Sequence, residues 1–251
     1  MKLRTTLMAF SMAALVSGCQ SLNTDALLQS GSQAFKAVSL SDSDVKTLSD
    51  QSCAQMDSEN TIAAANSAYG KRLGKIAAAL GDNINGTKVN YKVYTTKDVN
   101  AWAMANGCIR VYSGLMDLMT DNEVEGVLGH EMGHVALGHS RKAMQVAYGA
   151  SAARTAIGAT GGVAAQLSQS QIADLGEKLV NSKFSQSQET DADNYSYDLL
   201  KKRGINTAGL ASSFDKLDSL DAGRESSMFD SHPPSKERAE NIRKKIEADK
   251  K

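Results

Sequence analysis

The run from His130 to His134 places two histidines four residues apart, with Glu131 directly after the first. Residues four apart on a helix lie on one face, so both imidazoles can reach a single metal ion while Glu131 lies beside a water molecule at that ion. This is the zincin geometry, and it predicts one Zn²⁺ per chain held by His130 and His134, with Glu131 as general base. The alternative is a pair of ordinary surface histidines on a helix.

A third ligand must come from elsewhere in the chain. His139 follows His134 by five residues, whereas the metzincin pattern requires six, so we expect His139 to have a structural role. Glu189 and Asp193 share a face of a predicted helix, which makes Glu189 the candidate third ligand. Asp193, one turn later, is suited to orient a ligand imidazole through its second nitrogen. The alternative is an ordinary acidic helix start, stabilised by the helix dipole.

Two extended segments predict a small sheet near the metal-binding helix. Residues 89–93 alternate apolar and polar side chains after an Asn-Gly turn. Residues 108–112 form the second segment, and antiparallel pairing of the two is one option. Thr120 and Glu123 have capping-box spacing, so the helix that carries the metal motif is expected to begin there.

The remaining pattern is mainly helical, which predicts the fold class α+β with the sheet packed on the metal-binding helix. Other helices are expected to begin at Ser41, to span 61–80 and 189–202, and to follow Pro234. Residues 149–163, rich in Ala and Gly, are interpreted as a connector or helical hairpin rather than a membrane span.

The N-terminus predicts a lipoprotein signal. Lys2 and Arg4 precede an apolar run over 5–16 that is too short to span a bilayer comfortably. The sequence Leu-Val-Ser-Gly-Cys that ends at Cys19 resembles the lipobox of bacterial lipoproteins, in which the cysteine thiol is acylated. An uncleaved anchor helix and a structural cysteine are the alternatives.

The lipobox divides the chain into three parts. We expect residues 1–18 to be the signal peptide, 19–40 a tether and 41–251 one peptidase domain. Gln20, rather than Asp, follows the cysteine, which in Gram-negative bacteria favours sorting to the outer membrane. The domain would then be lipid-anchored and face the periplasm.

Charge and cysteine content limit the compartment and the partners. The chain has 28 basic and 28 acidic residues, so removal of a signal peptide with two basic residues leaves a net charge of about −2. We expect no nucleic-acid partner, and membrane affinity from the lipid rather than from a basic patch. Cys53 and Cys108 remain as an even pair in an oxidising compartment, where a disulfide is expected and two buried free thiols are the alternative.

Several motifs in this order resemble the family of zinc peptidases that includes the protease HtpX and the prenyl-protein endopeptidase of eukaryotes. The resemblance covers roughly residues 40–250. It lies in the metal helix His130–His139, the glutamate motif Glu189–Asp193, the element Ser231–Pro234 and the element Asn100–Ala103. The lipobox, without flanking membrane helices, matches the small lipoprotein members. Trp102 replaces a usual Phe, Asp191 a usual Glu, and Gln186 lies near the place of a usual Arg.

The resemblance implies a gluzincin-type domain and roles for residues outside the metal helix. It implies that His232 stabilises the developing oxyanion, with Asn100 as a second candidate. The alternative for His232 is a cap or packing role beside the two prolines. Residues 104–111, including Asn106, are expected to form an exposed edge to which an extended substrate adds as a strand, unless they form a core strand.

Together these features predict a zinc-dependent endopeptidase that hydrolyses unfolded or damaged envelope proteins, in contact with other envelope quality-control proteins. One alternative is an envelope lipoprotein chaperone or assembly factor with a structural or latent zinc site. A purely structural site has no use for a general base such as Glu131, which disfavours that alternative. A hydrolase of small amides is the other alternative, and the envelope tether disfavours it.

Overall fold

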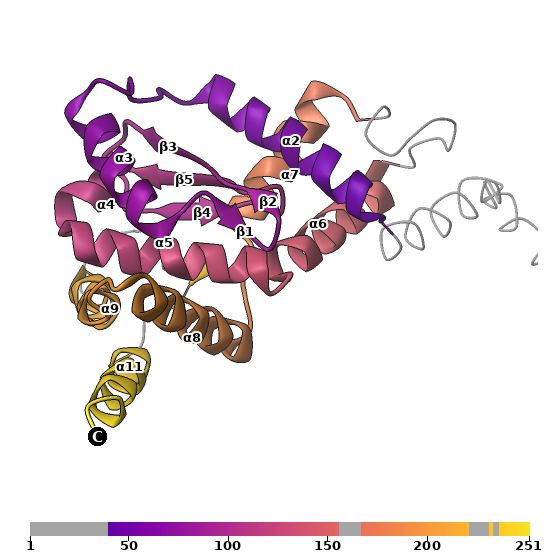
Figure 1. Cartoon of the computed structure of the whole chain (residues 1–251). Coiled ribbons are helices and arrows are strands. Elements are labelled where there is room, and N and C mark those ends of the chain that lie inside the picture. The colour runs from indigo at the N-terminus through magenta and orange to yellow at the C-terminus, as the bar shows by residue number, and fades with distance from the viewer. Residues whose placement is uncertain (1–39, 156–166, 221–230, 233–235) are drawn as a thin grey trace, which may run out of the picture.

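A small sheet and a set of helices make up the part of the chain that the structure, a computed structural model, describes: residues 40–155, 167–220, 231–232 and 236–251 (Figure 1). The predicted signal peptide, Cys19 and residues 20–39 lie outside it. In chain order the elements are α2 (Asp42–Glu59), α3 (Ala68–Leu80), β1 (Asn83–Ile84), β2 (Thr87–Lys88), β3 (Asn90–Tyr94), β4 (Ala101–Ala103), β5 (Cys108–Tyr112), α4 (Ser113–Leu118), α5 (Asp121–Ala136), α6 (His139–Thr155), α7 (Gln169–Val180), α8 (Gln186–Arg203), α9 (Ala208–Leu220) and α11 (Lys236–Ala248).

Helices cover both faces of the three-stranded sheet (Figure 1). On one face, α2 and the end of α7 enclose a cluster around Trp102 and Tyr94. On the other face, α5 and α3 pack against Val93, Ile109 and Val111, and this main core continues into α8, α9 and α11 on the far side of α5. The predicted α+β class, with a small sheet packed on the metal-binding helix, is confirmed.

The strand order is β3-β5-β4. β3 runs parallel to β5, with Asn90 opposite Cys108. β4 runs antiparallel to β5, with Ala101 opposite Val111. The antiparallel pairing considered for the two predicted strands is therefore wrong, because the chain crosses from β3 to the opposite edge of the sheet and returns as the hairpin β4-β5.

The hairpin makes β5 the central strand, so residues 104–111 do not form an exposed edge. The hairpin turns at Gly107, whose φ of 82° is a conformation that glycine adopts without strain. Cys108 accepts a hydrogen bond from Met104 at 2.9 Å on one side and pairs with β3 on the other. The outer strand next to α5 is β4, which is the short segment that precedes the predicted edge.

Close contact between α5 and α8 depends on two glycines. A Cβ atom at Gly129 would lie 2.6 Å from the hydroxyl oxygen of Ser196, and one at Gly133 would lie 3.0 Å from the backbone of Ala192. Larger side chains at these positions would push α8 away. The glycines therefore let α8 approach the face of α5 that carries His130.

The helix starts follow their capping residues. The Thr120–Glu123 capping box opens α5 as predicted. A second capping box, at Ser185 and Gln188, starts α8 three residues earlier than expected. The helix predicted over 61–80 begins only at Ala68, because Ser67 caps it and the preceding segment instead pairs with the edge of β3.

The predicted disulfide between Cys53 and Cys108 is present and joins α2 to β5. Closing a loop of this length stabilises a fold by about 4 kcal/mol in the loop-entropy model. Beside it, Arg110 is only 1% exposed and binds both carboxylate oxygens of Asp57, at 2.8 and 2.9 Å. The amine of Lys92 and the hydroxyl of Tyr94 also donate to Asp57, at 2.7 and 2.8 Å. α2 is thus fixed to the sheet by a covalent bond and a charge network.

No helix among the described residues is long and apolar enough to cross a membrane. The Ala- and Gly-rich stretch 149–163 begins inside α6, which ends at Thr155. The rest of that stretch lies outside the described residues.

We predict that Asp57→Asn lowers the free energy of unfolding by about 3 kcal/mol at pH 7, because it leaves the buried Arg110 without its counter-charge. Burial alone would raise the pKa of Asp57, but Arg110 and Lys92 outweigh it and hold the pKa below 3.8. The stabilisation by the Asp57 carboxylate is therefore complete above pH 3.8. It is lost as the pH falls through the lower pKa of Asp57 in the folded state. Urea unfolding at pH 7 and pH 3 measures both effects.

The control for this variant is Glu59→Gln, an exposed change on the same helix, which we expect to cost less than about 0.5 kcal/mol. The difference between the wild type and Asp57→Asn should be smaller at pH 3 than at pH 7. A difference between them that persists unchanged at pH 3 would show that shape rather than charge at position 57 matters.

Candidate metal centre

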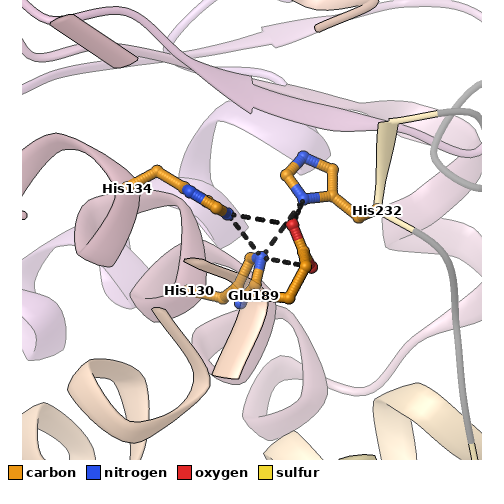
Figure 2. A group of neighbouring side chains, drawn as sticks. All are labelled: His130, His134, Glu189 and His232. Carbon is orange, nitrogen blue, oxygen red and sulfur yellow. Dashed lines mark hydrogen bonds and ion pairs between the residues drawn. The ribbon is translucent and has the colours of Figure 1, made fainter. Parts of the chain in front are cut away.

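Four buried side chains from three parts of the chain meet beside α5 (Figure 2). His130 and His134 come from α5, Glu189 from α8, and His232 from the described pair 231–232. Each is at most 6% exposed. One nitrogen or carboxylate oxygen from each side chain lies within 4.8 Å of those from the other three. The structure therefore brings together the three ligands expected from the sequence and adds a fourth donor.

The distances within this group fit a divalent metal. The Nε2 atoms of His130 and His134 are 3.0 Å apart, and they lie 3.5 and 3.4 Å from the two carboxylate oxygens of Glu189. Ligands of a tetrahedral zinc ion with bonds of about 2.0–2.1 Å are separated by roughly 3.4 Å. Two nitrogens and a carboxylate at these spacings are a donor set that suits Zn²⁺.

Asp193 sets the orientation of His130. Its Oδ1 lies 2.8 Å from Nδ1 of His130, so that nitrogen carries the proton and donates, and the lone pair of Nε2 faces the group. Asp193 thus makes the contact that the sequence suggested for it. On the other ligand, Nδ1 of His134 lies 3.0 Å from Nδ1 of His139. A turn at Gly138 separates α5 from α6, so His139 supports His134 from outside the group.

Arg238, on α11, is a site residue that the sequence did not reveal. Its guanidinium donates to both oxygens of Asp193, at 2.6 and 2.7 Å, and lies 2.8 Å from Oε2 of Glu189. The same group stacks over the ring of Phe214 at 4.3 Å. It supplies a positive charge to the glutamate motif, on Glu189 and Asp193. A single arginine in a charged amphipathic helix forms no motif, so no sequence signal pointed to it.

Around the donor group, the buried positive and negative charges of the described residues do not sum to zero. Glu131, Glu189 and Asp193 provide three carboxylates and Arg238 one guanidinium, which gives a formal charge of −2 if the imidazoles are neutral, as ligation requires. Uncompensated charge is costly in the protein interior. A divalent cation would neutralise this group, so the residues present fit a bound metal.

Burial and neighbouring charges shift the pKa values of these groups. Burial alone would raise the pKa of Glu189, but the imidazoles of His130, His134 and His232 outweigh it and hold the pKa far below the usual range. Burial lowers the pKa of His134 well below 6.5. Both shifts favour the forms that bind a metal, namely carboxylate and neutral imidazole.

Glu131 lies beside the donor group but outside it. Burial raises the pKa of its carboxyl, against the opposing charges of His232 and His130. Its Oε1 has no hydrogen-bond partner among the described residues and lies 3.6 Å from Nε2 of His232. A carboxylate whose pKa is raised is suited to accept a proton from a water molecule.

His232 occupies the position of a fourth donor. Its Nδ1 lies 3.3 Å from Nε2 of His130 and 3.0 Å from Oε1 of Glu189. The resemblance implied an oxyanion-binding role instead. At these distances the imidazole closes the donor group from the side that faces Glu131.

The two asparagines predicted to bind substrate lie outside the donor group. Asn100 is 1% exposed, and its side-chain amide has no hydrogen-bond partner among the described residues. Asn106 holds the β4-β5 turn: its amide nitrogen donates to Asp50 at 2.7 Å, and its oxygen accepts from the backbone of Cys108 at 3.1 Å. Both polar atoms of Asn106 therefore already bind the chain itself.

Residues 67–246 match the model of Peptidase family M48. The chain is 65% identical over 249 residues to Metalloprotease LoiP of Escherichia coli (strain K12), covering 99% of each chain. It is 61% identical over 241 residues to Metalloprotease YcaL of the same strain, covering 95% of each. A stretch of 50 residues is 46% identical to Protease HtpX of Thioalkalivibrio sulfidiphilus (strain HL-EbGR7), covering 18% of this chain and 17% of that protein.

The matched region contains the helices that bring the two histidines and Glu189 together, and the resemblance to the HtpX-like family is confirmed. Two metalloproteases align with this chain over nearly its whole length. The chain is therefore a metalloprotease that belongs to peptidase family M48.

Proposed function

We propose that this metalloprotease is a zinc-dependent endopeptidase, lipid-anchored through Cys19 in the bacterial outer membrane, that hydrolyses unfolded or damaged envelope proteins in the periplasm. The observation that carries the enzymatic part is the buried His130, His134 and Glu189 donor group with the buried Glu131 beside it. The lipobox at Cys19 supports the anchor. A disulfide, which persists in oxidising compartments, supports the periplasmic side.

The residues around the donor group divide the chemistry among them. His130, His134 and Glu189 would hold a zinc ion, which when bound would lower the pKa of a water molecule and polarise a carbonyl group. Glu131 accepts the proton of the attacking water and passes it to the leaving amine nitrogen. Asp193 and Arg238 keep His130 and Glu189 in place while that proton moves.

The outer strand β4 offers a main-chain site for a substrate strand. Asn100 and Met104 face β5 with their backbone hydrogen bonds, so the backbone of Ala101 and Ala103 faces the open edge. The hydroxyl of Ser140 already donates to the carbonyl of Ala103 at 3.2 Å. The free part of the edge can therefore pair with an extended polypeptide of many sequences, which suits unfolded substrates. The roles of Asn100 and Asn106 in substrate binding remain proposals.

A second candidate function is an envelope chaperone or assembly factor whose zinc site is structural or latent. His232 favours it, because a fourth protein donor is typical of a closed structural site, whereas a catalytic site keeps an open position. Glu131 favours the enzyme. The two candidates differ in whether the zinc-loaded wild type cleaves polypeptides.

We predict that Glu131→Gln abolishes proteolysis without loss of metal. The full-length variant should bind about one zinc per chain, as the wild type does, and cleave casein at least a hundredfold more slowly. A chelator should stop the wild type, and added Zn²⁺ should restore it. Glu125→Gln, on the same helix, is the matched control and should cleave normally. If both the wild type and Glu131→Gln bind zinc and neither cleaves, the chaperone function is favoured.

We predict that His232→Ala raises casein cleavage, because it opens the fourth donor position. A rise of about tenfold corresponds to a closed state populated roughly nine-tenths of the time. Zinc content and kcat are measured on the same preparation, and the double variant with Glu131→Gln should stay inactive. If kcat instead falls by about a hundredfold with zinc retained, His232 stabilises the oxyanion.

We predict that Cys19→Ser releases the protein from the membrane. After fractionation, the wild type should be found in the outer membrane and carry label from radioactive palmitate, and the variant should do neither. Gln20→Asp should keep the label but move to the inner membrane. Equal membrane association of the wild type and Cys19→Ser would exclude the lipid anchor.

A further inference from the structure

A groove of about 320 Å³ lies between α6 and the segment that joins α7 to α8. Its volume is within the range of ligand-binding pockets. Part of its lining forms an apolar wall, made up of Ala143, Val146, Ala147, Ala150 and Phe184. Val146 is 65% exposed, which makes it one of three exposed large hydrophobic residues in the described part of the chain. An exposed apolar wall of this kind is suited to take an apolar side chain.

The groove begins at the metal centre. The ring of Phe184 stacks on that of His134, with centroids 3.9 Å apart, and lies 5.3 Å from that of His232. His139 also lines the groove and contacts His134. A polypeptide whose scissile bond lies at the donor group therefore has an adjacent side chain within reach of the groove.

The rim of the groove is positively charged. Lys142, Lys178 and Lys183 line it. Asp174 pairs with Lys178. Lys142 and Lys183 are exposed and form no ion pair with any residue that the structure describes. Near the start of α6, Asp42 pairs with Arg141, and the charges of Asp191 and Glu189 act on His139. Two lysine charges at the rim are thus left to attract an anion.

We propose that this groove is a specificity pocket of the proposed peptidase, and that it selects polypeptides in which an apolar residue has an acidic neighbour. The apolar side chain enters between α6 and Phe184, and the neighbouring carboxylate binds Lys142 and Lys183. A basic neighbour is rejected by like charge. The inference rests on the proposed function, because it names the substrates that this same site prefers.

The test uses the full-length protein and internally quenched peptides that share one cleaved bond. At each of four positions on either side of that bond, the peptides carry Glu, Gln or Lys. We expect kcat/KM at one or two positions to be about fivefold higher for Glu than for Gln, and lower for Lys. The ratio should fall towards one in 0.5 M NaCl, because salt screens exposed charges.

Lys142→Glu combined with Lys183→Glu should reverse the preference, so that Lys peptides are cleaved faster than Glu peptides. Lys71→Glu combined with Lys75→Glu, an equal charge change on exposed residues of α3, should leave it unchanged. The salt dependence of the wild type tests the same interaction without any variant.

The outcomes separate the two proposals. If the wild type cleaves the peptides with equal kcat/KM for Glu, Gln and Lys at every position, the pocket assignment is wrong while the peptidase function stands. If zinc-loaded wild type cleaves none of them, and His232→Ala cleaves none either, both proposals are overturned. If both charge-reversed variants change the preference equally, the effect is one of net charge, and the groove assignment is also wrong.

Discussion

The close contact between α5 and α8 buries negative charge, which must be neutralised by groups from other parts of the structure. Gly129 and Gly133 let the two helices approach closely, which buries Glu189 and Asp193 against the histidines of α5. Water cannot stabilise carboxylates there, so protein groups must. Arg238 provides one positive charge from α11, and a divalent metal would provide the rest. The position of the C-terminal helix is therefore tied to the chemistry of a site formed mostly by other elements.

Sequence spacing predicted the part of the site that lies on single helices. Residues four apart, as in His130 and His134, must share a face, and the same holds for Glu189 and Asp193. Arg238 could not be found in this way, because its hydrogen bonds to Asp193 join residues 45 positions apart in sequence. Nor could spacing give the position of His232, whose Nδ1 lies 3.0 Å from Oε1 of Glu189. Only the packing of α5, α8 and α11 determines those distances.

The fold was predicted in its elements and less well in their pairing. Capping residues such as Thr120 and Ser67 act locally, so helix starts can be read from the sequence where the capping residue is noticed. Strand order depends on where a chain crosses, and the short strand β4 has only three residues to signal it. Missing β4 made β5 look like an edge. One unrecognised strand thus changed both the predicted pairing and the predicted substrate edge.

α2 connects the predicted tether to the elements that border the proposed substrate surfaces. This helix begins directly after the predicted tether, and the bond from Cys53 to Cys108 fixes it to the central strand. α2 also shares a hydrophobic cluster with α6 and α7, through Leu48, Met144 and Leu175. α6 in turn carries Ser140, which binds the open edge of β4, and the apolar wall of the groove. The disulfide at Cys53 therefore does more than add stability, because it holds the helix layer that borders both surfaces proposed to bind substrate.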